Sequence, residues 1–146
     1  MTRTALCLAL LLCACRGPLP FLAGGKLDGP VKTAPASFAF VENGTTIQLE
    51  TRPEAPYSVN VAAAIVGEGL YVNAGNTRTR WVQNIEATPL VRARIAGDVY
   101  ELAARRVTDT KEMDSFAEVW TKNAWARDPR KLEGDVYVFA LERRAR

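Results

Sequence analysis

The chain has 146 residues, with 19 basic side chains, 16 acidic side chains and no histidine. Because histidine is the usual general base, metal ligand and haem ligand, its absence argues against zinc sites, haem sites and Ser-His-Asp catalysis. The near balance of charge, without a basic stripe, argues against nucleic-acid binding.

The first 14 residues have the features of a secretory signal peptide. Arg3 gives a positive start, residues 5–14 are apolar, and Leu12-Cys13-Ala14-Cys15 is typical of the end of a bacterial lipoprotein signal. We therefore predict an exported protein that begins at a lipidated Cys15 and is membrane-anchored, with ordinary signal cleavage as the alternative. Because Arg16 and not aspartate follows, the outer membrane is favoured in a Gram-negative host. The apolar run is too short to span a bilayer, which needs about 20 residues.

Residues 15–36 are rich in glycine and proline and are predicted to be a tether that carries the lipidated cysteine. The three cysteines lie at positions 7, 13 and 15, so no disulfide is available to the rest of the chain. Residues 37–146 are expected to form a single domain held by its own core.

Alternating apolar and polar residues predict strands along most of this domain. The first three are expected over residues 38–41, 46–51 and 58–61, with Asn43-Gly44 as a hairpin turn between the first two. A second hairpin joins residues 62–66 to 70–72, and a third joins 91–95 to 99–107 through a tight turn at 96–98. Residues 136–141 are expected as the closing strand.

Two short helices interrupt the strands. The first is predicted over residues 78–87, with Asn76 or Thr77 as its N-cap, and Pro89 stops it. The second begins near Asp109 or Thr110 and carries one apolar stripe, formed by Met113, Phe116, Ala117, Trp120 and Ala124. Trp120 and Trp125 are expected in the core or in an interface rather than at a cofactor. Together these elements indicate a mainly β (α+β) chain that forms a small antiparallel barrel.

Residues 47–53, 56–61, 69–72 and 80–85, followed by Pro89 and the strand 91–95, resemble the pyridoxamine-phosphate-oxidase-like split barrels that bind flavin or deazaflavin. The order of these pieces carries the resemblance, which covers about residues 37–143. It implies a six-to-seven-stranded antiparallel split β-barrel with two short helices. It also implies a homodimer with FMN or a deazaflavin in the crevice between subunits, and hydride transfer at the flavin ring, for which the protein supplies binding and orientation.

Several residues are candidates for holding the phosphate of such a cofactor. The turn that contains Asn76 and Thr77 precedes a helix whose free N–H groups and positive dipole end favour an anion, and Arg78 and Arg80 add charge. Arg80 and Asn84 are one turn apart, so both can reach one ligand. The resemblance adds weight to these two residues and implies further cofactor contacts along one strand, at Tyr57, Ser58 and Asn60. Arg52 is a second candidate phosphate ligand.

A different interpretation of these residues stays open. Arg78 and Arg80 can be solvated residues of an exposed helix, and the neutral stretch at 73–76 departs from the basic stretch of the oxidases. Export also separates the protein from the cytoplasm, where flavin nucleotides are made. The two hypotheses are an oxidoreductase-like lipoprotein that binds FMN or a deazaflavin, and a non-catalytic, lipid-anchored module that binds a small molecule or a protein.

Overall fold

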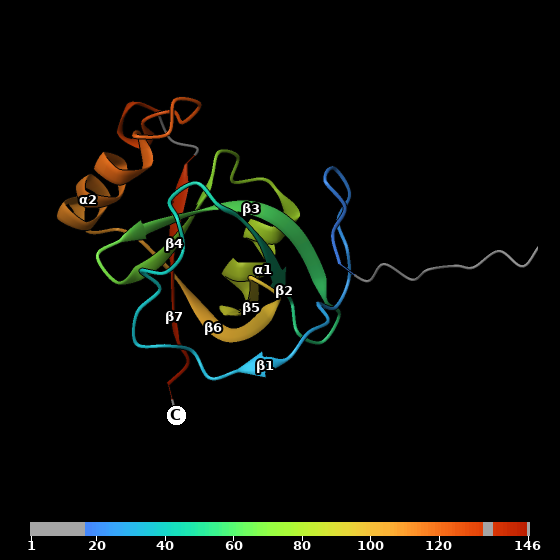
Figure 1. Ribbon diagram of the computed structural model, residues 1–146. Coiled ribbons are helices and arrows are strands. Elements are labelled where there is room, and N and C mark those ends of the chain that lie inside the picture. Colours follow the sequence, from blue (N-terminus) through green and yellow to red (C-terminus); the bar gives the residue numbers. More distant parts are fainter. Residues whose placement is uncertain (1–16, 133–135, 146) are drawn as a thin grey trace, which may run out of the picture.

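The computed structural model describes residues 17–132 and 136–145, so the predicted signal peptide and Cys15 lie outside the described part. Figure 1 shows its elements, which are the strands β1 (Val31–Lys32), β2 (Thr46–Thr51), β3 (Tyr57–Val66), β4 (Gly69–Ala74), β5 (Leu90–Ile95), β6 (Asp98–Arg106) and β7 (Tyr137–Arg143), the helices α1 (Arg80–Ala87) and α2 (Thr110–Trp120), and the 3-10 helix η1 (Pro129–Lys131). Within these residues, no helix has the length and apolar character needed to cross a bilayer.

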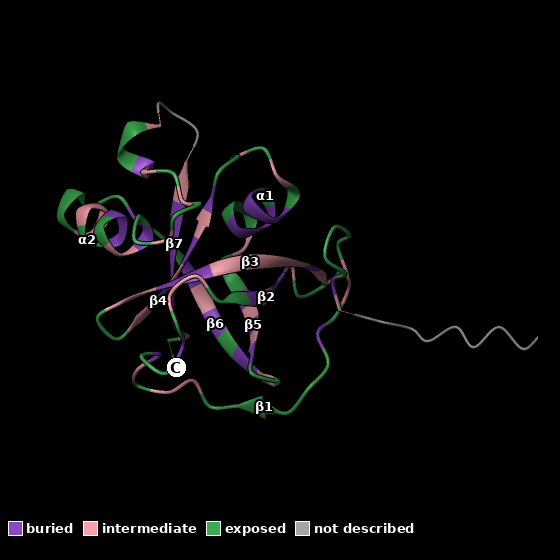
Figure 2. Ribbon diagram, turned by 45° about the horizontal axis from the view of Figure 1, so that its top comes forward, coloured by how far each residue is buried: buried purple, intermediate pink, exposed green. Residues whose placement is uncertain are grey.

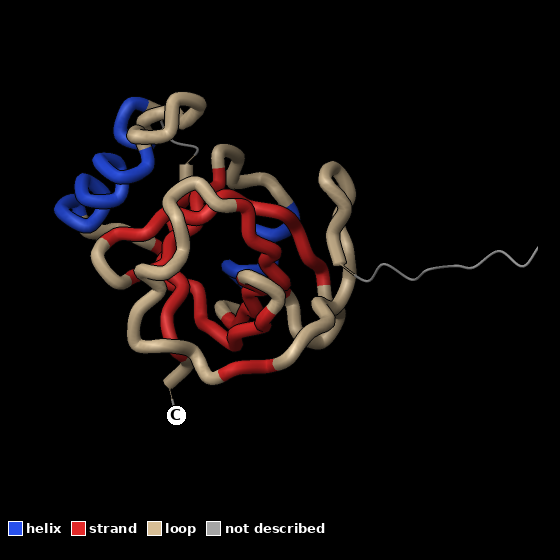
Figure 3. The backbone as a smooth tube through the Cα atoms, in the orientation of Figure 1, coloured by secondary structure: helices blue, strands red, loops and turns tan. Residues whose placement is uncertain are grey.

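Six strands close into an antiparallel barrel in the order β2-β3-β4-β7-β6-β5. The ring is completed by the pairing of β5 with β2 and of β6 with β7, and Figure 3 shows it nearly end-on. The short strand β1 adds to the outside, where Val31 lies parallel to Val99 of β6. The predicted fold, a mainly β split barrel with two short helices, is confirmed.

The barrel interior is filled by alternate strand residues, because successive side chains of a strand point to opposite faces. Buried residues of the strands such as Leu49, Val72 and Phe139 share one cluster with Trp81 and Val82 of α1. Helix α1 therefore packs its buried face into the barrel, as the burial colours of Figure 2 show. This packing places the loop before α1 at the barrel's end.

Helix α2 forms a second apolar layer on the outside of the barrel. Phe116 and Trp120 pack against outward-facing Ala64 of β3 and against Val138 and Ala140 of β7. The predicted start of this helix is confirmed, since the Asp109 side chain accepts a hydrogen bond from the Glu112 amide. Ala124, predicted to continue the stripe, lies beyond the end of the helix.

The predicted hairpin over residues 38–51 is wrong. Residues 38–41 form a turn instead, closed by a 2.9 Å hydrogen bond from Val41 N to the Phe38 carbonyl, and Gly44 donates to the Ala63 carbonyl. In the closed barrel, β2 is paired on one side with β3 and on the other with β5, so no edge remains for a partner from this segment.

The predicted cap of the first helix is also wrong. Thr79 is the N-cap, and α1 begins at Arg80 rather than at residue 78. Asn76 Oδ1 accepts a hydrogen bond from Arg78 N at 2.8 Å, which makes a side-chain turn ahead of the helix. The short polar side chain thus orders the loop and leaves the helix end free of a side-chain cap.

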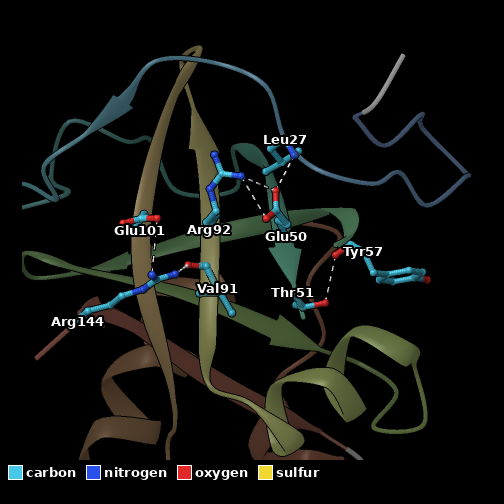
Figure 4. Close-up of polar contacts among 8 residues, drawn as sticks. All are labelled: Leu27, Glu50, Thr51, Tyr57, Val91, Arg92, Glu101 and Arg144. Atoms are coloured by element: carbon cyan, nitrogen blue, oxygen red, sulfur yellow. Dashed lines mark hydrogen bonds and ion pairs between the residues drawn. The ribbon is translucent and has the colours of Figure 1, made fainter. Parts of the chain in front are cut away.

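The N-terminal residues 17–36 lie along the barrel wall. Leu27 is buried, and its amide donates to Glu50 Oε2 at 2.6 Å. The Glu50 carboxylate is only 3% exposed and also pairs with Arg92 at 3.0 Å, as Figure 4 shows. A buried carboxylate is tolerated when it is paired and hydrogen-bonded, so this contact fastens the segment to β2 and β5.

At the other end of the chain, Arg144 follows β7 and hydrogen-bonds to the backbone of β5 and of β6. Its side chain donates to the Val91 carbonyl at 3.0 Å and to the Leu102 carbonyl at 3.1 Å. Figure 4 shows the Val91 contact together with the nearby Glu101, 3.7 Å away. The residues after β7 are therefore tied across β5 and β6.

Candidate functional site

A groove of about 650 Å³ lies between the barrel and the segment that follows α2. The middle of β3, the end of β4, the loop before α1 and the turn after α2 form its walls. The lining residues are Asn60, Val61, Ala62, Asn73, Ala74, Gly75, Asn76, Thr79, Trp81, Trp120, Trp125, Ala126, Arg127, Leu132 and Val136. Concave sites of this size, largely apolar with a few polar groups, are typical of small-molecule binding.

All three tryptophans of the chain line this groove. Trp120 is buried and stacks on Phe116 with ring centroids 5.5 Å apart. Trp125 packs edge-to-face on Trp120 at 5.1 Å, yet is 60% exposed. The packed ring holds the exposed one in place, so the groove offers a flat aromatic surface to a planar ligand.

The polar groups of the groove are mostly amides. Asn60, Asn73 and Asn76 line it together with Thr79. Asn73 Oδ1 is buried and has no hydrogen-bond partner among the described residues. An unmatched buried acceptor is costly, so Asn73 leaves an unsatisfied hydrogen-bond acceptor beside the groove.

Arg127 gives the groove its charge. Among the described lining residues it is the single ionised side chain, and no carboxylate joins it. The neighbouring Asp128 is engaged with Arg130 at 2.8 Å, and this hydrogen bond lowers the pKa of Asp128 to about 2. The groove therefore favours a neutral or anionic ligand. No cluster of three or more potential metal ligands occurs within residues 17–132 and 136–145.

Two of the predicted site residues, Asn60 and Asn76, meet in the groove. The Asn60 amide also donates to the Leu19 carbonyl at 3.0 Å, which fastens the N-terminal segment at this point. Thr77 and Arg78 belong to the same loop as Asn76 but do not line the groove. Arg78 is exposed and Thr77 is half-buried.

Arg80 and Asn84 share a helix but serve different surroundings. The Arg80 guanidinium is exposed and lies over the Tyr57 ring, 5.9 Å from its centroid. Asn84 is 9% exposed, and its amide donates to the Thr51 hydroxyl at 2.9 Å. One turn of helix thus separates a surface cation from a buried hydrogen bond.

Arg52 and Ser58 lie apart from the groove. Arg52 has a positive φ of 57° after β2 and donates to the Ala55 carbonyl at 2.8 Å. Ser58 is fully buried, and its backbone exchanges two 2.9 Å hydrogen bonds with Gly24. Its hydroxyl has no described partner.

Sequence reasoning did not propose Asn73, Trp125 or Arg127 as ligand contacts. Asn73 stands in a stretch noted only for its lack of charge, and Trp125 was assigned to the core or an interface. The available signal was the spacing of Trp125 and Arg127, a large aromatic residue two positions before a basic one. Trp125 and Arg127 come close to Asn73 because α2 packs on β3 and β7. No local sequence pattern predicts this packing.

Residues 56–139 match the family model described as F420H(2)-dependent quinone reductase. This segment runs from the start of β3 into β7 and spans more than half of the chain. The chain belongs to this family. The resemblance to flavin- and deazaflavin-binding split barrels is therefore confirmed, and the family is one of deazaflavin-dependent oxidoreductases. No curated protein sequence matches the chain.

Solved structures share the fold at low sequence identity. An Agrobacterium tumefaciens protein of unknown function aligns with a TM-score of 0.58 and 16% identity, covering 70% of this chain and 50% of that one. A proposed pyridoxamine 5'-phosphate oxidase from Listeria innocua aligns with a TM-score of 0.54 and 15% identity, covering 68% and 84%. An F420 reductase aligns with a TM-score of 0.51 and 16% identity, covering 77% and 96%.

Proposed function

We propose that this chain binds a reduced deazaflavin in the groove and catalyses hydride transfer from it to a quinone. The observation that carries the proposal is the groove itself, which is lined both by exposed Trp125 and by Asn73, whose buried amide oxygen has no partner among the described residues. A flat aromatic surface beside a hydrogen-bond acceptor suits the ring of such a cofactor. The matching family supplies the reaction class.

The residues present fit that cofactor, and their roles follow from their chemistry. Asn73 would accept a hydrogen bond from a ring N–H, and Asn60 and Asn76 would offer further amide contacts. Trp125 would cover an apolar ring face, and Arg127 would pair with a phosphate. The bound cofactor supplies the hydride. A quinone that receives this hydride and one proton from water becomes a hydroquinone.

The chain's own contribution is binding and orientation. No acidic side chain lines the described groove, so no negative charge there repels a phosphate. Burial on the barrel holds Asn73, whereas Trp125 stays open to the second reactant. FMN presents a similar ring and phosphate and is the competing cofactor.

We further propose that the protein is an exported lipoprotein and a homodimer. The Leu12-Cys13-Ala14-Cys15 pattern supports the first statement. For the second, the exposed Trp125 at the groove supports pairing, because aromatic residues are enriched in the cores of interfaces. Sedimentation of the purified protein tests this, with a dimer expected and a monomer at high micromolar concentration opposing it.

Titrating the deazaflavin F420 and, separately, FMN into the protein tests the function. We expect tighter binding of the deazaflavin, and oxidation of its reduced form when a quinone is added. Trp125→Ala should weaken binding about two- to tenfold, since aromatic contacts are worth roughly 0.5–1.5 kcal/mol beyond burial. Phe40→Ala is the matched control, because Phe40 is also exposed but lies outside the groove. Binding of neither cofactor would favour the non-catalytic binding module.

A further inference from the structure

We propose that residues 18–23 form a membrane-contact loop that inserts its apolar side chains into the lipid surface. The inference rests on the proposed lipid anchor at Cys15 and is independent of the cofactor and of the proposed reaction. Leu19 is 48% exposed, Leu22 is 65% exposed and Phe21 is 99% exposed. Exposing three large apolar side chains within four residues to water is unfavourable, and clustered exposed apolar residues mark interaction surfaces.

The loop has a defined shape. Leu22 N donates to the Leu19 carbonyl at 3.2 Å, which closes the tip into a turn, and the Asn60 amide donates to the same carbonyl at 3.0 Å. At the base, Gly24 is paired with Ser58 of β3. The backbone that carries these three exposed side chains is therefore tied to the barrel.

Gly24 closes the base of the loop by a contact that leaves no room for a side chain. A Cβ atom at this position would lie 2.4 Å from the Gly17 carbonyl carbon and 2.5 Å from Pro18 N. The chain thus returns directly onto its own backbone after seven residues. Such closely spaced ends are typical of compact surface loops with a function.

The loop lies against one side of the barrel, next to β3. Figures 1 and 2 both show it on the side opposite α2, at the point where the described chain begins. The loop therefore belongs to the first described residues and directly follows residues 1–16 in the sequence. Those residues include the apolar run 5–14 and Cys15, so the proposed membrane attachment precedes this loop by a few residues in the sequence.

The reach of the chain favours lipid as the occupant. Leu19 follows Cys15 by four residues, so the two Cα atoms are at most about 14 Å apart. This reach is shorter than the hydrocarbon core of a bilayer, which is about 30 Å thick. A Cys15 anchored in the membrane would therefore keep the loop at the membrane interface. Arg16 and Lys26 flank the loop, and no acidic residue lies between them, which suits anionic headgroups.

Fluorescence quenching by brominated lipid tests the proposal on the full chain. The protein would be reconstituted into phosphatidylcholine and phosphatidylglycerol vesicles with brominated acyl chains, and Phe21→Trp would be compared with Phe40→Trp. Phe40 is an exposed phenylalanine beyond the opposite end of β3, where Phe38 N bonds to the Glu68 carbonyl, roughly 25 Å along the strand from Ser58. The wild-type protein gives the signal of Trp81, Trp120 and Trp125.

The expected result is strong quenching of the added tryptophan in Phe21→Trp and quenching at the wild-type level in Phe40→Trp. Equal quenching in the two variants would overturn the proposal. The emission wavelength in vesicles without bromine gives a second criterion. If the Phe21→Trp tryptophan emits at a blue-shifted wavelength there, yet brominated lipid does not quench it, the loop contacts protein, such as a second copy, and the proposal is overturned. Phe21→Trp should bind cofactor like the wild type, so failure here is distinct from failure of the proposed function.

Discussion

The side-chain amide of Asn84 donates a 2.9 Å hydrogen bond to the hydroxyl of Thr51, which joins helix α1 to strand β2. The Thr51 hydroxyl in turn donates to the Tyr57 carbonyl at 3.2 Å, as Figure 4 shows. Asn84 was expected from its helical spacing to reach a ligand together with Arg80. Its amide is instead engaged in this chain of hydrogen bonds.

Asn84→Ala should therefore lower stability rather than cofactor affinity. Removing one partner of a buried hydrogen bond costs about 1–3 kcal/mol. Urea unfolding measures this, with Glu86→Ala, an exposed change on the same helix, as a control that should stay within about 0.5 kcal/mol of the wild type. Loss of cofactor binding at unchanged stability would instead place Asn84 in contact with the ligand.

Arg127→Ala should weaken binding of a phosphate-bearing cofactor by roughly tenfold to a hundredfold, because a charge-assisted hydrogen bond is worth about 1.5–3 kcal/mol. Arg80→Ala is the matched control, since Arg80 is an exposed arginine that faces Tyr57 and lies outside the groove lining. Titration monitored by cofactor fluorescence compares the two variants. A larger loss for Arg80→Ala would move the phosphate to the loop before α1.

Tyr71 makes stability sensitive to alkaline pH. Burial, and secondly the 2.9 Å hydrogen bond to Glu112, raise the pKa of Tyr71 to about 12. The unfolded tyrosine loses its proton near pH 10, so the stabilising contribution is complete below pH 10 and is lost as pH rises through 12. By linkage it amounts to at most about 2 kcal/mol, because the phenol is partly exposed and solvent screens its interactions.

Urea unfolding between pH 8 and 12 checks this. The wild type should lose more stability than Tyr71→Phe over the interval, so the difference between the two proteins narrows. Tyr57→Phe serves as a control, because its hydroxyl is remote from Glu112, and should follow the wild type. Parallel curves for wild type and Tyr71→Phe would contradict the linkage.

Cys15→Ala should prevent lipidation of the protein and lower its recovery in the membrane fraction, because acylation is one of the two proposed membrane contacts. Labelling with a fatty acid followed by cell fractionation measures both effects. A mutation at Cys13, which lies within the predicted signal, is the control. Unchanged labelling of Cys15→Ala would exclude lipidation at this position.

The sequence predicted the parts of the barrel that depend on local turns. The hairpins β3–β4 and β5–β6 form as expected, since Gly67 and Gly97 adopt the positive φ that their tight turns need. Asn43-Gly44 has an equally strong turn signal but makes no hairpin. Barrel closure decides this case, because β2 has no unpaired edge, and closure depends on strands far away in the sequence.

The groove was predicted only in part, for the same reason. Asn60 and Asn76 were found through the resemblance and through the turn before α1. Asn73 and Trp125 come from β4 and from the segment after α2, and they meet only because Phe116 and Trp120 pack that helix on the barrel's outer face. No periodicity within either segment contains this information.

The position of β7 has a consequence for how the protein forms. This strand pairs with both β4 and β6, so it supplies two seams of the barrel at once. A chain that lacks its last strand has two unpaired edges, and Arg144 is not yet available to join β5 and β6. The barrel therefore cannot close until almost the entire polypeptide has emerged. Late closure suits the proposed export, because a secretion channel accepts its cargo as an unfolded chain.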